Sequence, residues 1–276
     1  MNEQATATKC GFVAIVGATN AGKSTLVNQA VGTKISIVTH KVQTTRSRVL
    51  GVMIEDNAQI VLVDTPGIFD PRRRLDRAMI QAAWQGAADA DVVALIVDAK
   101  RGATEDVLGI IEKLADIKAP KLLVLNKIDL LERSRLLDLT AKLNASGIFQ
   151  ETLMVSALNG DGVRDLISQF TRHMPDSPWL FPEDQLTDMP NRQLAAEITR
   201  EKAFLRLHQE LPYSLTVETD TWEERKDGSV KIDQTIFVTR DGHKGIVIGK
   251  SGATLKAIGA EARAELEEIL GHRVHL

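Results

Sequence analysis

A loop near the start of the chain contains residues whose types and spacing could bind phosphate. Residues 17–24 read GATNAGKS, which fits the phosphate-loop pattern G-x-x-x-x-G-K-[ST] at every fixed position. Glycines let successive backbone N–H groups turn inward and form a concave anion site. The residues expected to contact the nucleotide are Gly17, Asn20, Ala21, Gly22, Lys23, Ser24 and Thr25.

The context of this loop favours a nucleotide site over a chance glycine turn. Residues 12–16 (FVAIV) form a short apolar run typical of a buried strand, and a helix is expected to begin near Lys23. The positive end of that helix would add to the anion site. Lys23 would reach the β- and γ-phosphates, and the Ser24 hydroxyl would ligate Mg²⁺.

A second motif, Asp64-Thr65-Pro66-Gly67, follows a predicted strand some forty residues later. A carboxylate at a strand end can hold Mg²⁺ through water, so Asp64 is a candidate metal residue. The Gly67 N–H would meet the γ-phosphate.

The motif Asn126-Lys127-Ile128-Asp129 predicts which base is bound. Guanine presents N1–H and an exocyclic amine as two donors, and one carboxylate can accept both. Adenine would leave a buried Asp129 unpaired, at a cost of about 1–3 kcal/mol. Asn126 would bridge the base to the loops, the Lys127 stem would cover the ring, and Ser156-Ala157 would direct a backbone N–H at guanine O6. The expected ligands are therefore GTP or GDP with Mg²⁺.

The elements around these motifs predict an α/β fold in residues 1–174. Apolar strands alternate with helices, which indicates a mainly parallel, doubly wound sheet with helices on both faces. The predicted strands are 12–16, 48–55, 59–64, 92–98, 121–125 and 152–155, and the helices begin near 23, 72, 104, 133 and 163. Residues 34–46 have no clean period and are predicted to be an exposed connection that orders around a ligand.

Residues 175–190 are predicted to be a proline-rich linker, and residues 191–276 a second, smaller α+β domain. Pro175, Pro178, Pro182 and Pro190 indicate an extended connector, whose apolar Trp179-Leu180-Phe181 segment we expect to dock on a domain surface. The order that follows is a helix over 191–210, strands over 215–223 and 230–239, a glycine loop and a long helix over 253–270. Residues 273–276 are predicted to begin a final strand that is either short or truncated.

The segment Gly249-Lys250-Ser251-Gly252 matches the G-x-x-G loop of KH domains, which clamps single-stranded RNA backbone. This motif alone is weak, but the order of elements around it favours a type II KH domain. From Pro190 onward the chain contains 13 lysines and arginines and 14 acidic residues. The positive charge needed to bind RNA must therefore come from a local patch. The predicted RNA-binding residues are Lys244, Ile246, Ile248, Gly249, Lys250, Ser251, Gly252 and Lys256.

The composition limits the kinds of protein that this chain can be but does not indicate a specific function. The net charge of −3 over 276 residues gives no general attraction to nucleic acid or anionic membranes. The single cysteine, Cys10, excludes an internal disulfide and fits a reducing cytosol. We find neither a signal peptide nor an apolar run long enough to span a bilayer, and therefore expect a soluble, cytoplasmic protein.

With these motifs in order, the whole chain resembles the TRAFAC-class translation-factor-like GTPases. Residues 43–46 (QTTR) and the C-terminal half make it similar to the Era-like ribosome-assembly GTPases that carry a KH domain. The resemblance implies GTP hydrolysis, binding to the 3′ region of 16S ribosomal RNA and a role in small-subunit biogenesis. It also implies that the second threonine of QTTR is the Mg²⁺ ligand that senses the γ-phosphate; by position this is Thr45, with Thr44 less favoured.

The resemblance also bears on the catalytic residues, which we assign as Lys23, Thr45 and Gly67. Ras-like GTPases carry a water-orienting glutamine at the next position, where this chain has Ile68. A hydrocarbon cannot orient water, so intrinsic hydrolysis should be slow.

Two alternatives remain at this stage. One is an RNA-binding adaptor that holds the nucleotide as a structural ligand, and the other is a switch protein of the membrane surface. No basic amphipathic helix or lipidation signal supports the latter. We expect a monomer with at most weak peripheral contact to the inner face of the cell membrane, and no binding to DNA.

The base assignment predicts the effect of Asp129→Asn. An amide donor would meet the guanine donors but would suit the carbonyl of xanthine. GTP affinity should fall by at least about tenfold, while xanthosine triphosphate affinity rises. A nucleotide-displacement titration measures both, and unchanged GTP affinity would refute the assignment.

Overall fold

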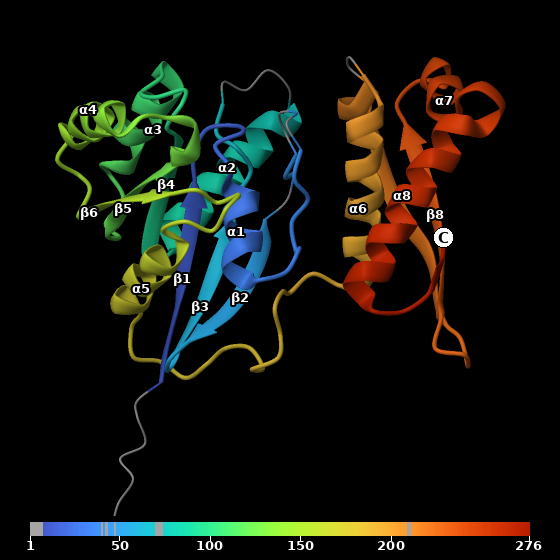
Figure 1. Ribbon diagram of the computed structural model, residues 1–276, viewed down its shortest axis with the longest axis horizontal. Coiled ribbons are helices and arrows are strands. Elements are labelled where there is room, and N and C mark those ends of the chain that lie inside the picture. Colours follow the sequence, from blue (N-terminus) through green and yellow to red (C-terminus); the bar gives the residue numbers. More distant parts are fainter. Residues whose placement is uncertain (1–7, 40, 42–43, 47, 70–73, 209–210) are drawn as a thin grey trace, which may run out of the picture. The chain divides into compact units, whose positions relative to one another are not determined.

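The computed structural model describes residues 8–39, 41, 44–46, 48–69, 74–208 and 211–276 (Figure 1). The chain divides into two compact units. The first unit comprises residues 1–36 and 45–188, and the second comprises residues 37–44 and 189–276.

The first unit is built on a six-stranded sheet with strand order β2-β3-β1-β4-β5-β6. Only β2 runs antiparallel to its neighbour, β3. The strands are β1 (Lys9–Val16), β2 (Val49–Glu55), β3 (Ala58–Asp64), β4 (Val92–Asp98), β5 (Lys121–Asn126) and β6 (Glu151–Val155). The helices are α1 (Lys23–Val31), α2 (Arg74–Asp89), α3 (Glu105–Leu114), α4 (Arg133–Asn144) and α5 (Val163–His173).

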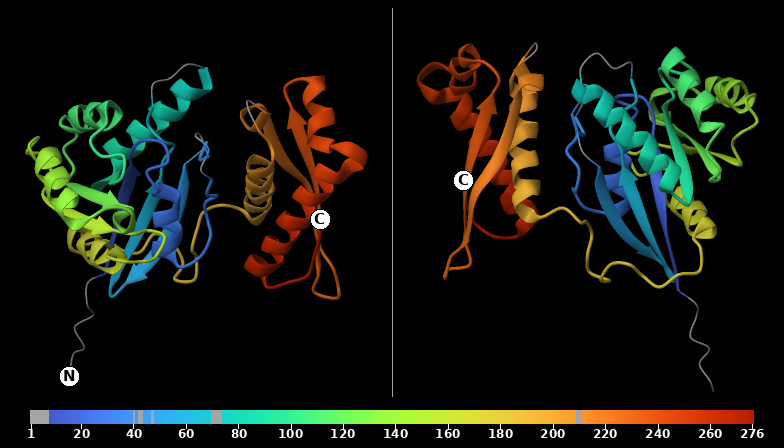
Figure 2. Two further views of the ribbon diagram at one scale, coloured as in Figure 1. Left: turned by 45° about the horizontal axis from the view of Figure 1, so that its top comes forward. Right: turned by 180° about the vertical axis from the view of Figure 1, so that it is seen from behind.

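Helices cover both faces of this sheet, which confirms the predicted doubly wound α/β fold (Figure 2). One face packs against α2, α3 and α4 in a continuous apolar core. Helices α1 and α5 lie against β2 and β3 on the other face. Every residue of β3 and β5 is buried, as expected for strands covered on two sides. The parallel strands therefore bring their carboxyl ends, and the motifs that follow them, to one edge.

The connection over residues 34–46 differs from the exposed segment that the sequence predicts. Ile35 and Ile37 are buried. The Asn28 side chain accepts hydrogen bonds from the Ile35 and Ser36 N–H groups at 3.0 and 2.9 Å and donates to the Ser36 carbonyl at 2.7 Å. The sequence of this segment has no regular hydrophobic period, so the burial of the two isoleucines and their fixation by Asn28 could not be predicted. Gln43 of the QTTR segment, and the start of the predicted helix at residues 72–73, lie outside the described residues.

Residues 175–188 form a connector that docks on the sheet of the first unit. Trp179 and Phe181 pack against Cys10, Leu50 and neighbouring apolar residues, whereas Leu180 is exposed. The buried side chain of Gln59 accepts hydrogen bonds from the N–H groups of Leu180 and Phe181 at 2.8 and 3.0 Å and donates to the Phe181 carbonyl at 2.8 Å. One glutamine thereby satisfies the backbone polar groups of an extended segment that has no sheet partner there.

The second unit has a three-stranded sheet, order β7-β8-β9, packed against helices. Its elements are α6 (Asn191–Arg206), β7 (Leu215–Glu224), β8 (Val230–Val238), α7 (Asp241–Ile248), α8 (Ala253–Leu270) and β9 (Val274–His275). Strand β7 is antiparallel to β8, and β9 pairs parallel with β8 through Val230 and Lys231. Its core joins α6, β8, α8 and β9, consistent with the predicted α+β domain.

Two details of the second unit were not predicted correctly. Helix α6 ends at Arg206 rather than continuing to residue 210, because Leu207 is extended and its side chain enters the core. Residues 209–210 lie outside the described residues. The segment before Gly249 is helix α7 rather than loop. Glycines and β-branched residues have low helix propensity, and burial of Val247 in the core overrides it.

Val38, Lys41 and Thr44 contact α6 and the residue after it within the second unit. The Val38 N–H donates to Glu201 Oε1 at 2.7 Å, and the Arg200 guanidinium donates to the Thr44 carbonyl at 2.6 Å. Lys41 donates to the carbonyls of Phe204 and Leu207, where it caps the end of the helix. The chain then enters the first unit at Thr45.

Replacing Gln59 tests the docking of the connector. Gln59→Leu would leave two N–H groups and one carbonyl without their partner, and it should lower the free energy of unfolding by about 2–4 kcal/mol. Chemical denaturation measures this loss. Gln81→Leu makes the same change at an exposed position of α2 and should cost less than about 0.5 kcal/mol. Equal stabilities of the two variants would contradict the role of Gln59.

Candidate functional site

The predicted phosphate loop joins β1 to α1 at the carboxyl edge of the large sheet. Gly22 has a φ of 94°, and a Cβ there would come within 2.2 Å of Asn126 Nδ2, so only glycine fits. Helix α1 begins at Lys23, as the sequence predicts. The Lys23 ammonium folds back over the loop and donates to the carbonyls of Gly17 and Ala18 at 3.1 and 3.0 Å.

Lys23 and Asp64 are buried ionisable groups of opposite charge. Burial lowers the pKa of Lys23 to about 8, and the negative charge of Asp64 opposes that shift. Burial raises the pKa of Asp64, while the hydrogen bond from Ser24 and the charge of Lys23 oppose the rise. Each group needs further opposite charge to be fully stabilised, and a nucleotide phosphate with a divalent cation supplies both signs.

The three predicted metal residues, Ser24, Thr45 and Asp64, lie in contact with one another. Ser24 Oγ donates to Asp64 Oδ2 at 2.7 Å and lies 3.0 Å from Thr45 Oγ1, which is 3.5 Å from the same carboxylate oxygen. Asp64 Oδ1 is buried without a hydrogen-bond partner among the described residues. An orphaned carboxylate oxygen beside two hydroxyls suits a hard, oxygen-seeking cation such as Mg²⁺.

Described His, Cys, Asp and Glu side chains nowhere gather in groups of three that could hold a metal ion by themselves. This agrees with the donor set at Asp64, because Mg²⁺ is usually bound by one or two carboxylates together with substrate phosphates.

The two threonines of the QTTR segment have different environments. Thr45 lies at the Ser24–Asp64 pair, whereas Thr44 Oγ1 lies 2.7 Å from Thr39 Oγ1 and donates to the Lys41 carbonyl at 2.8 Å. The geometry supports Thr45 over Thr44 as the metal-ligating hydroxyl.

Ile68 cannot face the phosphates in this arrangement. Its N–H donates to the Gly17 carbonyl at 3.0 Å, and its side chain lies in the apolar core between the sheet and α2–α4. Position 68 is therefore a packing position, and Gly67 immediately before it stays beside Thr19 of the phosphate loop.

Asn126 connects the three loops of the predicted base pocket. Its buried side chain donates to the Ala21 carbonyl at 2.8 Å and accepts from the N–H groups of Lys127 and Ala157 at 2.8 and 3.0 Å. The Lys127 ammonium donates to the Asn20 carbonyl at 2.8 Å.

One expectation about the base pocket needs correction. Asp129 is exposed rather than buried, and its Oδ1 accepts a hydrogen bond from Ser156 Oγ at 2.6 Å. The Ala157 N–H already donates to Asn126, and the Ser156 N–H donates to the Asp161 carbonyl at 2.9 Å. Sequence reasoning missed these internal bonds because they join residues that are distant along the chain or that depend on the local turn.

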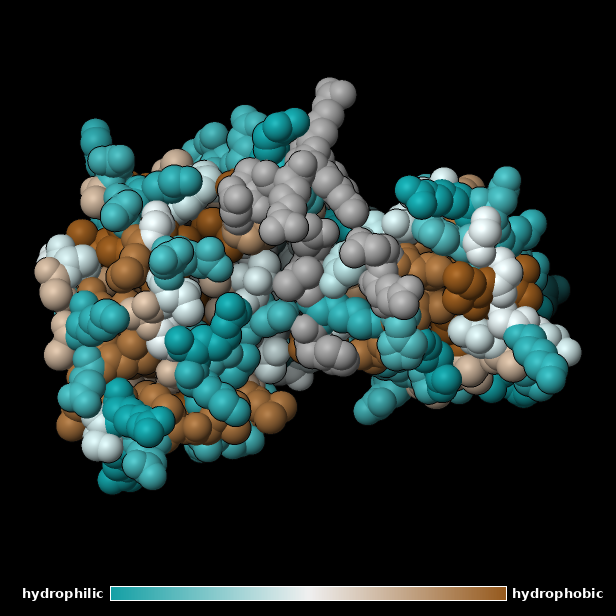
Figure 3. Space-filling view, turned by 90° about the horizontal axis from the view of Figure 1, so that it is seen from above, coloured by the Kyte–Doolittle hydropathy of each residue, from teal (hydrophilic) through white to brown (hydrophobic). Residues whose placement is uncertain are grey.

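The predicted RNA-binding loop follows α7 in the second unit. Gly249 has a φ of 74°, and a Cβ there would lie 2.2 Å from Thr254 Oγ1, so glycine is required. Lys244, Ile246, Ile248, Lys250 and Ser251 are all exposed, as is Lys256 on the first turns of α8. Exposed Leu255 adds to the apolar side chains of this part. A space-filling view shows hydrophobic residues on the molecular surface among the hydrophilic ones (Figure 3).

Acidic residues further along α8 are engaged elsewhere in the second unit. Glu261 pairs with Arg206, and Glu265 pairs with Lys202, both on α6. Glu267 accepts the Val274 N–H at 3.0 Å. These contacts offset the negative charge of α8, which leaves the lysines of the loop as a local positive patch despite the balanced composition.

Comparison with known families matches both units. Residues 12–127 match the 50S ribosome-binding GTPase family, and residues 210–276 match the KH domain family. The GTPase Era of Dinoroseobacter shibae is 60% identical over 279 residues, which cover 100% of this chain and 91% of the relative. The GTPase Era of Afipia carboxidovorans is 59% identical over 274 residues, covering 99% and 89%. The chain belongs to the Era family of GTPases.

Solved Era structures share the fold. One, of Era in complex with MgGDPNP and nucleotides 1506–1542 of 16S ribosomal RNA, is 40% identical, with a TM-score of 0.93, and covers 98% of this chain and 92% of that chain. Another, of a tyrosine-to-alanine variant of Aquifex aeolicus Era bound to GDP·AlF4⁻, is 40% identical with a TM-score of 0.92, and covers 98% of this chain and 92% of that chain. Over the part of this chain that the structure describes, helices long and apolar enough to cross a membrane do not occur.

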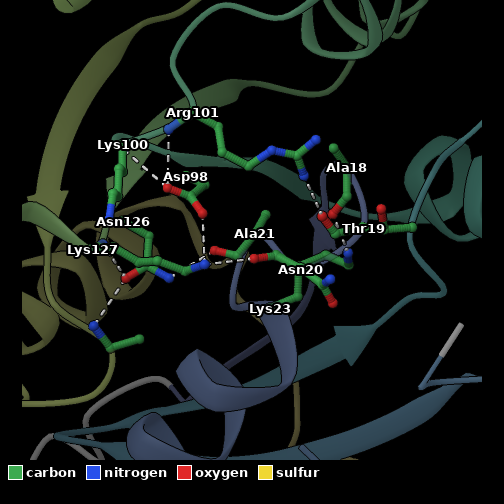
Figure 4. A network of polar contacts seen from close by, with 11 residues as sticks. Ala18, Thr19, Asn20, Ala21, Lys23, Asp98, Lys100, Arg101, Asn126 and Lys127 are labelled. Carbon is green, nitrogen blue, oxygen red and sulfur yellow. Dashed lines mark hydrogen bonds and ion pairs between the residues drawn. The ribbon is translucent and has the colours of Figure 1, made fainter. Parts of the chain in front are cut away.

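Sequence reasoning missed two polar residues that touch the site, one at the end of β4 and one in the loop that follows it (Figure 4). Asp98 contacts Lys127 with its Oδ2 at 2.6 Å, and Arg101 donates to the Thr19 carbonyl at 3.2 Å. The only available signal was the place of Asp98 at the end of a buried strand, beside the strands that carry Asp64 and Asn126.

The two threonines form a matched pair for a test of the metal site. Thr45→Ala should lower the GTP hydrolysis rate at least about tenfold and raise the Mg²⁺ concentration needed for half-maximal rate, because a Mg²⁺ ligand is lost. Thr44→Ala, which removes a hydroxyl bonded away from Asp64, should change the rate less than about twofold. Phosphate release across a Mg²⁺ titration measures both variants. A larger effect from Thr44→Ala would reverse the assignment.

Proposed function

We propose that this chain binds GTP with Mg²⁺ in the first unit, hydrolyses it to GDP and phosphate, and binds the 3′ region of 16S ribosomal RNA through the KH domain. Its role is in the biogenesis of the small ribosomal subunit. The observation that carries the nucleotide assignment is the convergence of Ser24, Thr45 and the unsatisfied Asp64 oxygen beside the buried Lys23.

The site residues of the first unit have separate roles in GTP hydrolysis. Ser24, Thr45 and Asp64 would hold Mg²⁺, which would neutralise negative charge on the nucleotide phosphates. Lys23 leaves the carbonyls of Gly17 and Ala18 to contact the phosphate oxygens. The Gly67 N–H donates to the γ-phosphate, where negative charge accumulates as the bond breaks.

Intrinsic hydrolysis is slow in this proposal, because position 68 supplies no group that orients water. The Ile68 side chain is committed to the core of the first unit, so a small rotation cannot bring it to the phosphate.

Guanine selectivity rests on Asp129, whose carboxylate accepts both donors of the base. In the structure Ser156 Oγ donates a hydrogen bond to this carboxylate. The exposed position of Asp129 leaves it open to the incoming base, which then covers it. Asn126 and Lys127 frame the pocket from β5, and the Ala157 N–H shares its hydrogen bond with guanine O6.

RNA binding rests on the exposed G-x-x-G loop. Lys244, Lys250 and Lys256 supply charge, and Ile246 and Ile248 supply apolar contacts to bases. The positive end of α8, an 18-residue helix that begins after Gly252, faces the same backbone. The proposed protein is a cytoplasmic monomer that acts on the small ribosomal subunit, with at most weak contact to the inner face of the membrane.

Substituting the two variable residues of the loop separates the functions of the units. Lys250→Asp combined with Ser251→Asp keeps both glycines and places two carboxylates against RNA phosphates. Affinity for an RNA of nucleotides 1506–1542 of 16S ribosomal RNA should fall at least about a hundredfold, and loss of the Lys250 contact should flatten the log–log salt dependence by about one unit. Phosphate release without RNA should stay within about twofold of wild type.

Lys226→Asp, at an exposed turn of the same unit, is the control for charge reversal alone and should lower RNA affinity far less. Surviving RNA affinity in the double variant would remove the loop as the RNA site. Absence of multiple-turnover phosphate release from wild type, with and without RNA, would instead favour an adaptor that holds its nucleotide as a structural ligand.

A further inference from the structure

Three successive carbonyl groups of the phosphate loop accept hydrogen bonds from side chains of other segments of the first unit (Figure 4). Thr19 O accepts from the Arg101 guanidinium at 3.2 Å, and Asn20 O accepts from the Lys127 ammonium at 2.8 Å. Ala21 O accepts from the Asn126 amide at 2.8 Å. Two of the three donors are cations.

Holding these carbonyls fixes the N–H groups that follow them. In a trans peptide the C=O of one residue and the N–H of the next point in opposite directions. Outward carbonyls at residues 19–21 therefore turn the N–H groups of residues 20–22 to the inner side of the loop. The Ala21 N–H indeed faces the Ala18 carbonyl at 3.4 Å, the same carbonyl that Lys23 contacts from inside. This is the arrangement of an anion-binding nest.

The β4–α3 loop supports two of the three carbonyls. Asp98, the last residue of β4, accepts the backbone N–H groups of Lys100 and Arg101 through Oδ1 at 3.0 and 3.3 Å. These bonds close the turn from which Arg101 extends to Thr19. Through Oδ2 the same carboxylate holds the Lys127 ammonium, which reaches Asn20. One aspartate thus orients both cationic donors.

We infer that Arg101 and Asp98 are positioning residues of the phosphate site, which hold its backbone N–H groups inward before the nucleotide binds. Neither residue touches the nucleotide in this role. A preorganised loop loses less conformational freedom on binding, so the benefit appears as nucleotide affinity. The inference rests on the proposed function, because it takes the loop to be the phosphate site.

The β-phosphate distinguishes this role from general support of the fold. The nest cradles the α- and β-phosphates, so GDP should depend on it more than GMP does. Arg101→Ala should raise the Kd for GDP, and for a non-hydrolysable GTP analogue, by about five- to tenfold. The Kd for GMP should rise less than about twofold, and the melting temperature without nucleotide should stay within about 2 °C because Arg101 is exposed.

Matched variants separate positioning from simple charge attraction. Lys100 is exposed in the same loop, and its side chain makes no hydrogen bond or ion pair among the described residues, so Lys100→Ala removes the same charge alone. This variant should bind GDP as wild type does. Arg101→Lys should recover most of the lost affinity, because an ammonium can still donate to Thr19 O. Asp98→Ala should weaken GDP binding at least as much as Arg101→Ala, since Lys127 and Arg101 both lose their anchor.

Fluorescence titration of the full chain with GDP, the GTP analogue and GMP gives these ratios. Equal losses in Arg101→Ala and Lys100→Ala would overturn the inference in favour of charge attraction. Equal losses for GDP and GMP together with a lower melting temperature would overturn it in favour of a brace for the fold. Lys23→Ala checks the premise: if it binds GDP as wild type does, the phosphate-site assignment fails and the inference falls with it. If only Lys23→Ala loses affinity, the phosphate site stands and the inference alone is refuted.

Discussion

The burial of two opposite charges, Lys23 and Asp64, is the constraint on which the proposed nucleotide site depends. Each charge is removed from water, and burial displaces the pKa of each toward its neutral form. Isolated buried charges are costly, so the pair persists only where backbone carbonyls, hydroxyls and each other compensate it. The six-stranded sheet provides that place, because β1 and β3 are adjacent and parallel and deliver both residues to one edge.

The same edge gathers the polar groups that we propose to recognise a nucleotide. Asp64, Asp98 and Asn126 each end a strand of the same parallel sheet, and their side chains connect loops that are far apart along the chain. Satisfied polar networks of this kind are rigid, since each partner removes freedom from the next. The phosphate loop therefore depends on residues well outside its own motif, including the β4–α3 loop.

The KH domain is expected to bind negatively charged RNA without a net positive charge. Its composition is balanced, with 13 basic and 14 acidic residues from Pro190 onward, yet it must attract a polyanion. Pairing of Glu261 and Glu265 with cations of α6 offsets the acidic charge of α8, while the lysines near Gly249 remain exposed. The proposed binding surface therefore rests on local arrangement rather than on net charge.

The sequence by itself determined the α/β class, the order of the strands and helices in the first unit, and the four nucleotide motifs, because these depend on local periodicity and on fixed spacing along the chain. It also indicated the KH domain from the order of its elements. Helix α7, the burial of Ile35 and Ile37, the exposure of Asp129 and the contacts of Asp98 and Arg101 were decided only by the tertiary structure. Each of these depends on side chains brought together from separate segments, and packing and hydrogen-bond satisfaction there outweigh the local preferences that a sequence displays.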